Sequence, residues 1–249
     1  MAAFHVVFPL YPGVTHLDFT GPHQVLSRLP GAQVHVASMG GQDIEAEGLV
    51  FTRLEDLTQV GRCDLICVPG GFGTTDAMLD EAFVAEIRRL ASGAKYVTSV
   101  CTGSLLLAAA GLLQGRRAAT HWAWRELLHP FGVTVDEGRV VRCGNVFTGG
   151  GVTAGIDLAF TIVAEIAGQE FAQALQLGLE YAPEPPFQSG RPEIAPEAVL
   201  DSVLERLGPL RQGPDGRRRA GRGPPAPDGL ILPPPRSGGR GRPGYFLGA

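Results

Sequence analysis

The sequence predicts an α/β fold in which helices cover both faces of a mostly parallel sheet. Short apolar runs of strand length alternate along the chain with segments of helix length, which is typical of doubly wound sheets. One run, residues 63–69, is apolar apart from Asp64, is closed by a glycine pair and is followed by a helical pattern. Such a run indicates a central parallel strand that is buried on both faces. The length of 249 residues and the 44% hydrophobic content suit one large core.

The first elements follow from local patterns. Residues 4–8 form an apolar run that ends in a Pro-Gly loop, so they predict a buried strand. An amphipathic helix is expected from about residue 19 to 28. Residues 33–37 alternate apolar with polar side chains and predict a second strand, and residues 44–52 predict a small hairpin or paired strands.

The strand and helix pattern then repeats. The strand at 63–69 precedes a helix at 81–90, and a strand at 96–100 precedes an apolar helix at 102–110. The later elements are a helix near 122–128, a hairpin-like stretch at 133–148, and helices at about 153–167, 170–178 and 196–207. We predict a flavodoxin-like sandwich.

Two regions of different composition divide the chain. Residues 1–207 are expected to form one catalytic domain, and residues 208–249 an Arg/Pro/Gly-rich tail with too little apolar content to fold. The tail holds eight Arg and two Asp, about +6, so the net charge of −4 leaves about −10 for the domain. An acidic domain gives no reason to expect nucleic-acid binding. No apolar stretch is long enough to suggest a membrane span. The run at 4–10 contains His5 and has no basic residue before it, so it does not indicate a secretory signal, and a cytoplasmic location is expected.

The four cysteines are too few and too scattered for a disulfide scaffold, and no paired spacing suggests a metal site. Cys63 and Cys67 are expected to flank a buried strand. Cys101 stands between an apolar strand and a helix, with small residues two positions before and after it, Ser99 and Gly103. This is the steric requirement of a nucleophile elbow. The helix start beyond Cys101 predicts a lowered thiol pKa, although a buried structural cysteine would fit the local pattern too.

Several motifs together resemble the ThiJ/PfpI superfamily, and within it the bacterial isocyanide hydratases. The likeness extends from about residue 4 to 207. The motifs are Leu17-Asp18-Phe19-Thr20-Gly21-Pro22, Cys67-Val68-Pro69-Gly70-Gly71, Ser99-Val100-Cys101-Thr102-Gly103, Thr120-His121-Trp122, Thr148-Gly149-Gly150-Gly151-Val152-Thr153-Ala154-Gly155-Ile156-Asp157 and Leu179-Glu180-Tyr181-Ala182-Pro183-Glu184-Pro185-Pro186-Phe187.

The resemblance implies roles for three residues. Cys101 attacks the terminal isocyanide carbon. Asp18 is the acidic residue that contacts the thiol and shuttles a proton, and Thr102 positions the reacting groups through hydrogen bonds. Without the resemblance, Asp18 would be interpreted as the N-cap of the helix expected from residue 19. Superfamily peptidases tend to carry histidine directly after the nucleophile. Because Thr102 stands there in this chain, a cysteine–histidine peptidase of that type is disfavoured.

The substrate-contact candidates are less specific. His121 is either a partner of Cys101 or a helix-start histidine that bonds locally and packs on Trp122. The triple glycine at 149–151 lacks the companions of a phosphate loop, so it indicates a close backbone approach to the nucleophile. Val152, directly after the triple glycine, is therefore expected to line the pocket of the nucleophile. The resemblance, rather than the spacing, adds Gly71, Gly150 and His121 as substrate-binding residues.

The resemblance implies hydration of an isocyanide to an N-substituted formamide, without metal or organic cofactor, by a homodimer. Two alternatives stay open. The same elbow with an acidic neighbour supports glyoxalase or deglycase chemistry on 2-oxoaldehydes. A ligand-sensing domain of a transcription activator would instead require an additional DNA-binding domain.

Overall fold

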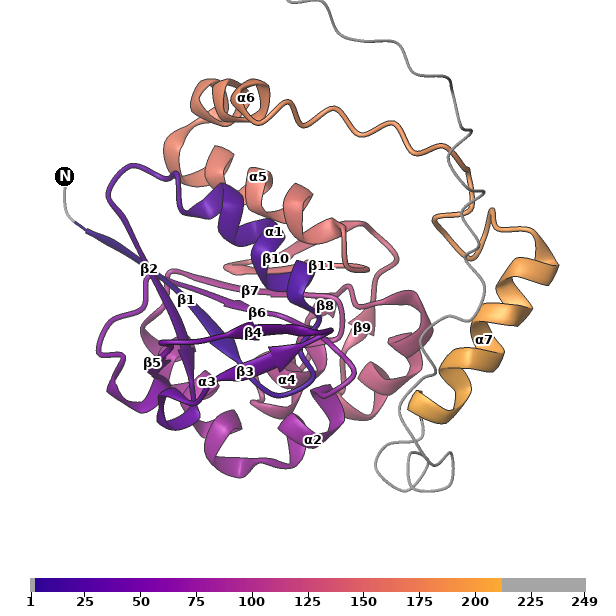
Figure 1. Cartoon of the computed structure of the whole chain (residues 1–249), viewed down its shortest axis with the longest axis horizontal. Helices are drawn as coiled ribbons and strands as arrows, with labels where there is room; N and C mark the ends of the chain where they lie inside the picture. Colours follow the sequence, from indigo (N-terminus) through magenta and orange to yellow (C-terminus); the bar gives the residue numbers. More distant parts are fainter. Residues whose placement is uncertain (1–2, 212–249) are drawn as a thin grey trace, which may run out of the picture.

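The computed structural model describes residues 3–211, and its centre is a seven-stranded sheet (Figure 1). The strand order is β10-β11-β7-β6-β1-β2-β5. Every neighbouring pair is parallel except β10 and β11. The prediction of a mostly parallel α/β sheet is confirmed. The strands are β1 (Phe4–Leu10), β2 (Ala32–Ser38), β5 (Glu55–Asp56), β6 (Leu65–Val68), β7 (Tyr96–Val100), β10 (Val140–Cys143) and β11 (Val146–Gly149).

Helices cover both faces of the sheet. On one face α1 packs against α5, and α5 against α6; on the other face α2, α3 and α4 pack together (Figure 1). The 3-10 helix η3 contacts both α4 and the last helix, α7. The helices are α1 (His16–Leu26), α2 (Thr74–Leu79), α3 (Glu81–Gly93), α4 (Gly103–Ala109), α5 (Ala154–Ala167), α6 (Gln169–Gly178) and α7 (Glu197–Arg211), with the 3-10 helices η1 (Met39–Gly41), η2 (Leu57–Gln59) and η3 (Trp122–Phe131).

The core lies where the central strands meet the helices. All four residues of β6 are fully buried, and so are Val6, Val7 and Phe8 of β1. Apolar burial on both faces of these strands supplies the main driving force for folding. The carboxyl ends of β6 and β7 therefore stand on a rigid base, and the loops that follow them are held in place.

Two expectations about elements were wrong. Residues 133–148 do not form one hairpin: β9 (Thr134–Val135) pairs in parallel with β8 (Arg117–Ala118), and only β10 and β11 form a hairpin. The first helix begins at His16 rather than near residue 19, with Thr15 at its N-cap position. The small antiparallel pair β3 (Ile44–Ala46) and β4 (Leu49–Phe51) is the expected hairpin at 44–52.

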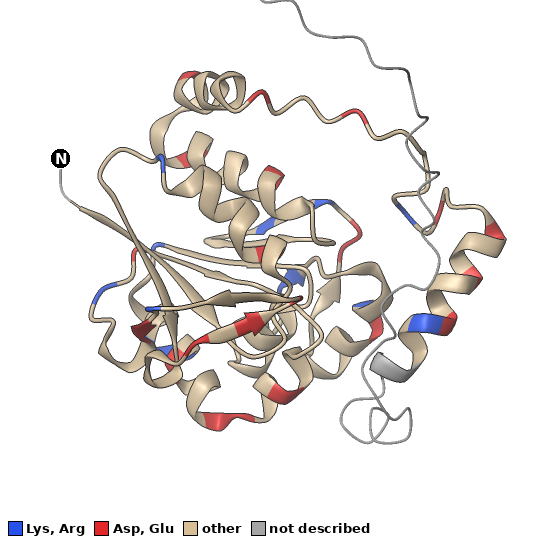
Figure 2. Cartoon of the chain, in the orientation of Figure 1, with Lys and Arg blue, Asp and Glu red and all other residues tan. Residues whose placement is uncertain are grey.

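Charged residues are spread over the part of the chain that the structure describes. In Figure 2 the positions of Lys and Arg and those of Asp and Glu are scattered over helices, strands and loops. Within residues 3–211, no helix is both long and apolar enough to cross a membrane. The Arg/Pro/Gly-rich tail predicted at 208–249 lies almost entirely outside the described residues, and α7 extends past the expected boundary at residue 207 to Arg211.

Candidate active site

Cys101 occupies the sharp turn between β7 and α4. Its φ of 57° lies in the left-handed region, which non-glycine residues adopt rarely and often at functional sites. Its backbone N–H donates to two carbonyls at the end of β11, Gly149 O at 3.1 Å and Gly150 O at 2.8 Å. This geometry fits the elbow that the sequence predicted, and the triple glycine provides the close backbone approach.

Two glycines allow the loop after β6 to approach the elbow. A Cβ on Gly103 would stand 2.2 Å from the carbonyl oxygen of Val68. A Cβ on Gly70 would stand 2.5 Å from the backbone nitrogen of Thr102 and 2.9 Å from a carboxyl oxygen of Asp18. Any side chain at either position would push the two loops apart.

Asp18 projects from the first turn of α1 and is fully buried. Its Oδ2 accepts a hydrogen bond of 2.9 Å from the N–H of Gly70. Its Oδ1 has no partner in hydrogen-bonding geometry among the described residues, although the carboxyl is close enough to Cys101 for the two groups to shift each other's pKa. The N-cap interpretation is wrong, because the helix begins two residues before Asp18.

Burial raises the pKa of Asp18 to about 7. The Gly70 N–H and the thiol of Cys101 act in the opposite direction, and the negative charge of Glu47 raises the pKa further. Asp18 can therefore hold or release a proton near neutral pH, which suits a group that transfers protons.

The prediction of a lowered thiol pKa was wrong. Burial and the charge of Asp18 raise the pKa of Cys101 well above its ordinary value, and the N–H of Thr102 lowers it only in part. Cys101 is 5% exposed, and α4 is a short helix of seven residues, so desolvation of the thiolate exceeds the helix-dipole effect. The sulfur is consequently a thiol at rest, and it needs a base when it reacts.

A chain of buried hydroxyl groups connects Thr102, next to the nucleophile, with Thr74 and Tyr11. Thr102 Oγ1 accepts from the N–H of Gly71 at 2.9 Å and lies 2.8 Å from Thr74 Oγ1. Thr74 Oγ1 lies 2.9 Å from the hydroxyl of Tyr11, which donates to the carbonyl of Pro69 at 3.0 Å. Neither Tyr11 nor Thr74 was expected from the sequence. Tyr11 follows β1 and Thr74 begins α2, and no local pattern connects them.

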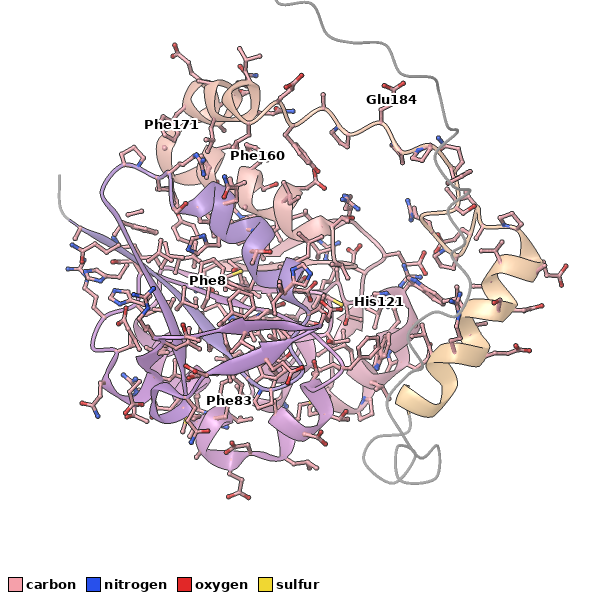
Figure 3. The ribbon with its side chains drawn as sticks, in the orientation of Figure 1. Phe8, Phe83, His121, Phe160, Phe171 and Glu184 are labelled. Atoms are coloured by element: carbon pink, nitrogen blue, oxygen red, sulfur yellow. The ribbon has the colours of Figure 1, made fainter. Side chains whose placement is uncertain are left out.

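A cavity of about 210 Å³ opens over Cys101. It brings together five residues that the sequence proposed, and it adds others from the β3–β4 turn, the loop after β6, η3 and α7. His121, one of its walls, lies on the side of the sheet toward α7 (Figure 3). The lining residues are Thr15, Glu47, Gly71, Phe72, Cys101, Thr102, His121, Trp124, Val152 and Leu207.

Gly150 lies beside a second cavity, of about 270 Å³, which shares His121 and Val152 with the first. This cavity is lined by charged side chains, including Arg125 and Arg139, and does not reach Cys101. Because the reactive sulfur belongs to the smaller cavity, the chemistry is assigned there. Gly150 contributes a carbonyl to the elbow and does not line the cavity over Cys101.

His121 is the N-cap of η3, and its Nδ1 accepts from the N–H of Ala123 at 3.2 Å. Its ring packs against Trp122 and Trp124, with centroids 5.6 and 5.0 Å away. Burial, with a smaller effect of Arg125, lowers its pKa to about 4. His121 is therefore neutral at neutral pH, and its accepting Nδ1 assigns the ring proton to Nε2. The interpretation as a locally bonded helix-start histidine is confirmed, although the ring also lines the cavity.

Among residues 3–211, no three His, Cys, Asp or Glu side chains are grouped closely enough to hold a metal ion. The fold and the site define a class of α/β proteins that hold a cysteine at the carboxyl edge of a parallel sheet, beside a buried acid. Residues 4–165 match the DJ-1/PfpI family, and the chain belongs to this family.

Relatives within this fold have several functions. The chain is 50% identical over 210 residues to an isonitrile hydratase of Pseudomonas putida, covering 83% of this chain and 91% of the relative. A solved ThiJ/PfpI family protein from Pseudomonas syringae superposes with a TM-score of 0.82 at 36% identity, over 89% of this chain and 92% of that one. The HTH-type transcriptional regulator CdhR of Pseudomonas aeruginosa is 31% identical over 66% of this chain, which spans 51% of that protein.

Proposed function

We propose that this protein hydrates an isocyanide, also called an isonitrile, to an N-substituted formamide. The 50% identity to an isonitrile hydratase over most of both chains supports this reaction. The structural observation that carries the proposal is the pairing of Cys101 with a buried acid, Asp18, beneath a small cavity. A thiol and a proton-transferring acid are the two groups that the reaction needs, because the terminal carbon of an isocyanide must receive a nucleophile and a proton.

The first half of the reaction uses the thiol and the carboxyl together. Asp18 takes the thiol proton as the sulfur attacks the terminal carbon, so the thiolate exists only when it reacts. Asp18 then gives the proton to the same carbon, and a thioimidate on Cys101 results. A pKa near 7 allows the carboxyl to do both.

The second half requires water. Water adds to the thioimidate carbon, a proton reaches the nitrogen, and the tetrahedral adduct expels the sulfur to give the formamide. The N–H of Thr102 stabilises the departing thiolate, in line with its lowering of the Cys101 pKa. Phe72, Trp124, Val152 and Leu207 provide an apolar wall for the substituent on nitrogen.

Infrared spectroscopy tests the function directly. Incubation with a panel of small alkyl and aryl isocyanides should remove the isocyanide stretch and produce the corresponding formamide. The Cys101→Ser variant should show no turnover and gives the background of the assay. Retention of the stretch across the whole panel would refute the proposal. A 2-oxoaldehyde in a parallel assay tests the glyoxalase alternative.

The cytoplasm as location and the homodimer as assembly remain predictions. Sedimentation at micromolar concentration would give a species of about twice 26.3 kDa for the dimer.

A further inference from the structure

Glu47 is one of the residues that line the cavity over Cys101. It belongs to the two-residue turn between β3 and β4, where Glu47 has a φ of 53° and Gly48 a φ of 85°. Two positive φ values define a turn that favours Asn-Gly or Asp-Gly. A glutamate in the first position is strained without benefit to the turn, and such strain points to a function of the side chain.

The side chain of Glu47 is fixed at the start of α1. Its Oε2 accepts from the N–H of His16 at 3.2 Å and lies 3.7 Å from the Nε2 of the same residue. The side chain remains 45% exposed, so it can exchange protons with solvent. It is also close enough to Asp18, two residues after His16, to affect that carboxyl electrostatically.

The hydration half of the proposed reaction needs a base on the cavity side of the sulfur. Asp18 is fully buried and does not line the cavity, so it is not placed to meet a water molecule there. His121 is neutral and its Nδ1 is occupied by the N–H of Ala123, so it can only donate. Cys101 is itself bonded to the substrate at this stage. Glu47 is the carboxylate that remains among the lining residues.

We propose that Glu47 is the general base of the hydration step. This inference rests on the proposed isocyanide hydration through a thioimidate. Glu47 takes a proton from water as the oxygen bonds to the thioimidate carbon, and it passes that proton to the imine nitrogen. The adduct then collapses: Glu47 takes the hydroxyl proton as the C–S bond breaks, it returns that proton to the departing sulfur, and the formamide leaves. Every group returns to its starting state.

The test separates the two halves of the reaction. Glu47→Gln keeps the length of the side chain and an acceptor for the His16 N–H, but it cannot take a proton. Turnover should fall by about 10²-fold or more, the range for loss of a general base. Adduct formation should stay within a few-fold of wild type, so intact-protein mass spectrometry of acid-quenched samples should show Cys101 carrying the mass of the isocyanide.

Two further variants serve as controls. Glu45→Gln changes an exposed glutamate of the same hairpin that does not line the cavity, and it should turn over like wild type. Glu47→Asn also removes the base, but it suits the positive φ, so it should accumulate the same adduct without loss of melting temperature. It keeps the test decisive if Glu47→Gln folds poorly.

Two results would overturn the inference. Wild-type turnover in both Glu47 variants would exclude any role in the rate. Slow turnover without an adduct would show that Glu47 acts only through Asp18, in the first step. Failure of the proposed function looks different, because the wild-type protein would then form no formamide from any isocyanide.

Discussion

At the residue scale, Cys101 and Asp18 form a buried pair in which the sulfur keeps its proton at rest. Burial raises the pKa of both groups, and the charge of Asp18 raises the pKa of Cys101 further, whereas the thiol lowers the pKa of Asp18. Because they interact strongly, the pair titrates as a unit. Catalysis then depends on moving one proton between sulfur, carboxyl and substrate carbon.

Asp18→Asn tests this proton transfer. The amide keeps the shape of the side chain and can still accept from the N–H of Gly70, but it carries no exchangeable acid proton. Turnover should fall by about 10²–10⁴-fold, while substrate binding changes far less. Steady-state rates of wild type and Asp18→Asn measure this loss, and the inactive Cys101→Ser variant gives the background rate. Retention of more than about a third of wild-type turnover, well above that range, would remove the role from Asp18.

The same carboxyl should make stability depend on pH. Its pKa is about 7 in the folded protein against about 4 in an unfolded chain, so the folded state binds the proton more tightly. The stabilisation is complete below pH 4 and is lost as the pH rises through 7. Between pH 5 and 8, the free energy of unfolding of wild type should fall by about 2–3 kcal/mol relative to Asp18→Asn. Urea denaturation of both proteins at the two pH values measures this, and parallel pH dependences would contradict it.

At the element scale, the elbow depends on how closely the β6 loop approaches the start of α4. Gly103→Ala should destabilise the protein by about 1–3 kcal/mol, because its Cβ would collide with the backbone oxygen of Val68. Gly93→Ala, at the end of α3, has open space around the added Cβ and is the matched control. It should be neutral or slightly stabilising. Equal melting temperatures for the two variants would show that the β6 loop can shift.

The sequence was informative where burial is continuous and local. It predicted β7 to the residue, and it placed α3, α5 and α6 within a few residues, because each has its own apolar pattern. The β8–β9 pair was missed, since it joins Arg117 to Thr134 across 17 positions and has no local periodicity.

The same distinction applies to the site. Cys101 could be found from its neighbours in the chain, whereas Asp18 required a family resemblance. Glu47, Thr74 and Tyr11 were not found at all, because only the folded chain brings these distant positions to the nucleophile. The direction of the thiol pKa shift was wrong for a related reason: burial of the sulfur by distant segments has no signature in the local sequence.

At the scale of the whole molecule, the cavity depends on a distant part of the chain. Leu207 of α7 is one of its walls, and α7 reaches the body through η3. Leu207→Ala should enlarge the cavity and change kcat/KM by up to about 10-fold in favour of bulkier isocyanides, with little effect on small ones. Leu177→Ala, on an 83% exposed side chain, is the control. An unchanged order of preference among isocyanides would show that α7 does not shape the cavity.

The walls over Cys101 have a consequence for evolutionary diversification. The nucleophile and its acid are fixed in the rigid core, whereas the walls come from separate peripheral segments: the residue before α1, the turn at Glu47, the loop after β6, η3, the loop before α5, and α7. Substitutions in one of these segments can alter which molecule is accepted without disturbing the sulfur. New specificities can therefore arise in small, independent steps, which gives a physical reason why one fold serves hydratases and transcriptional regulators alike.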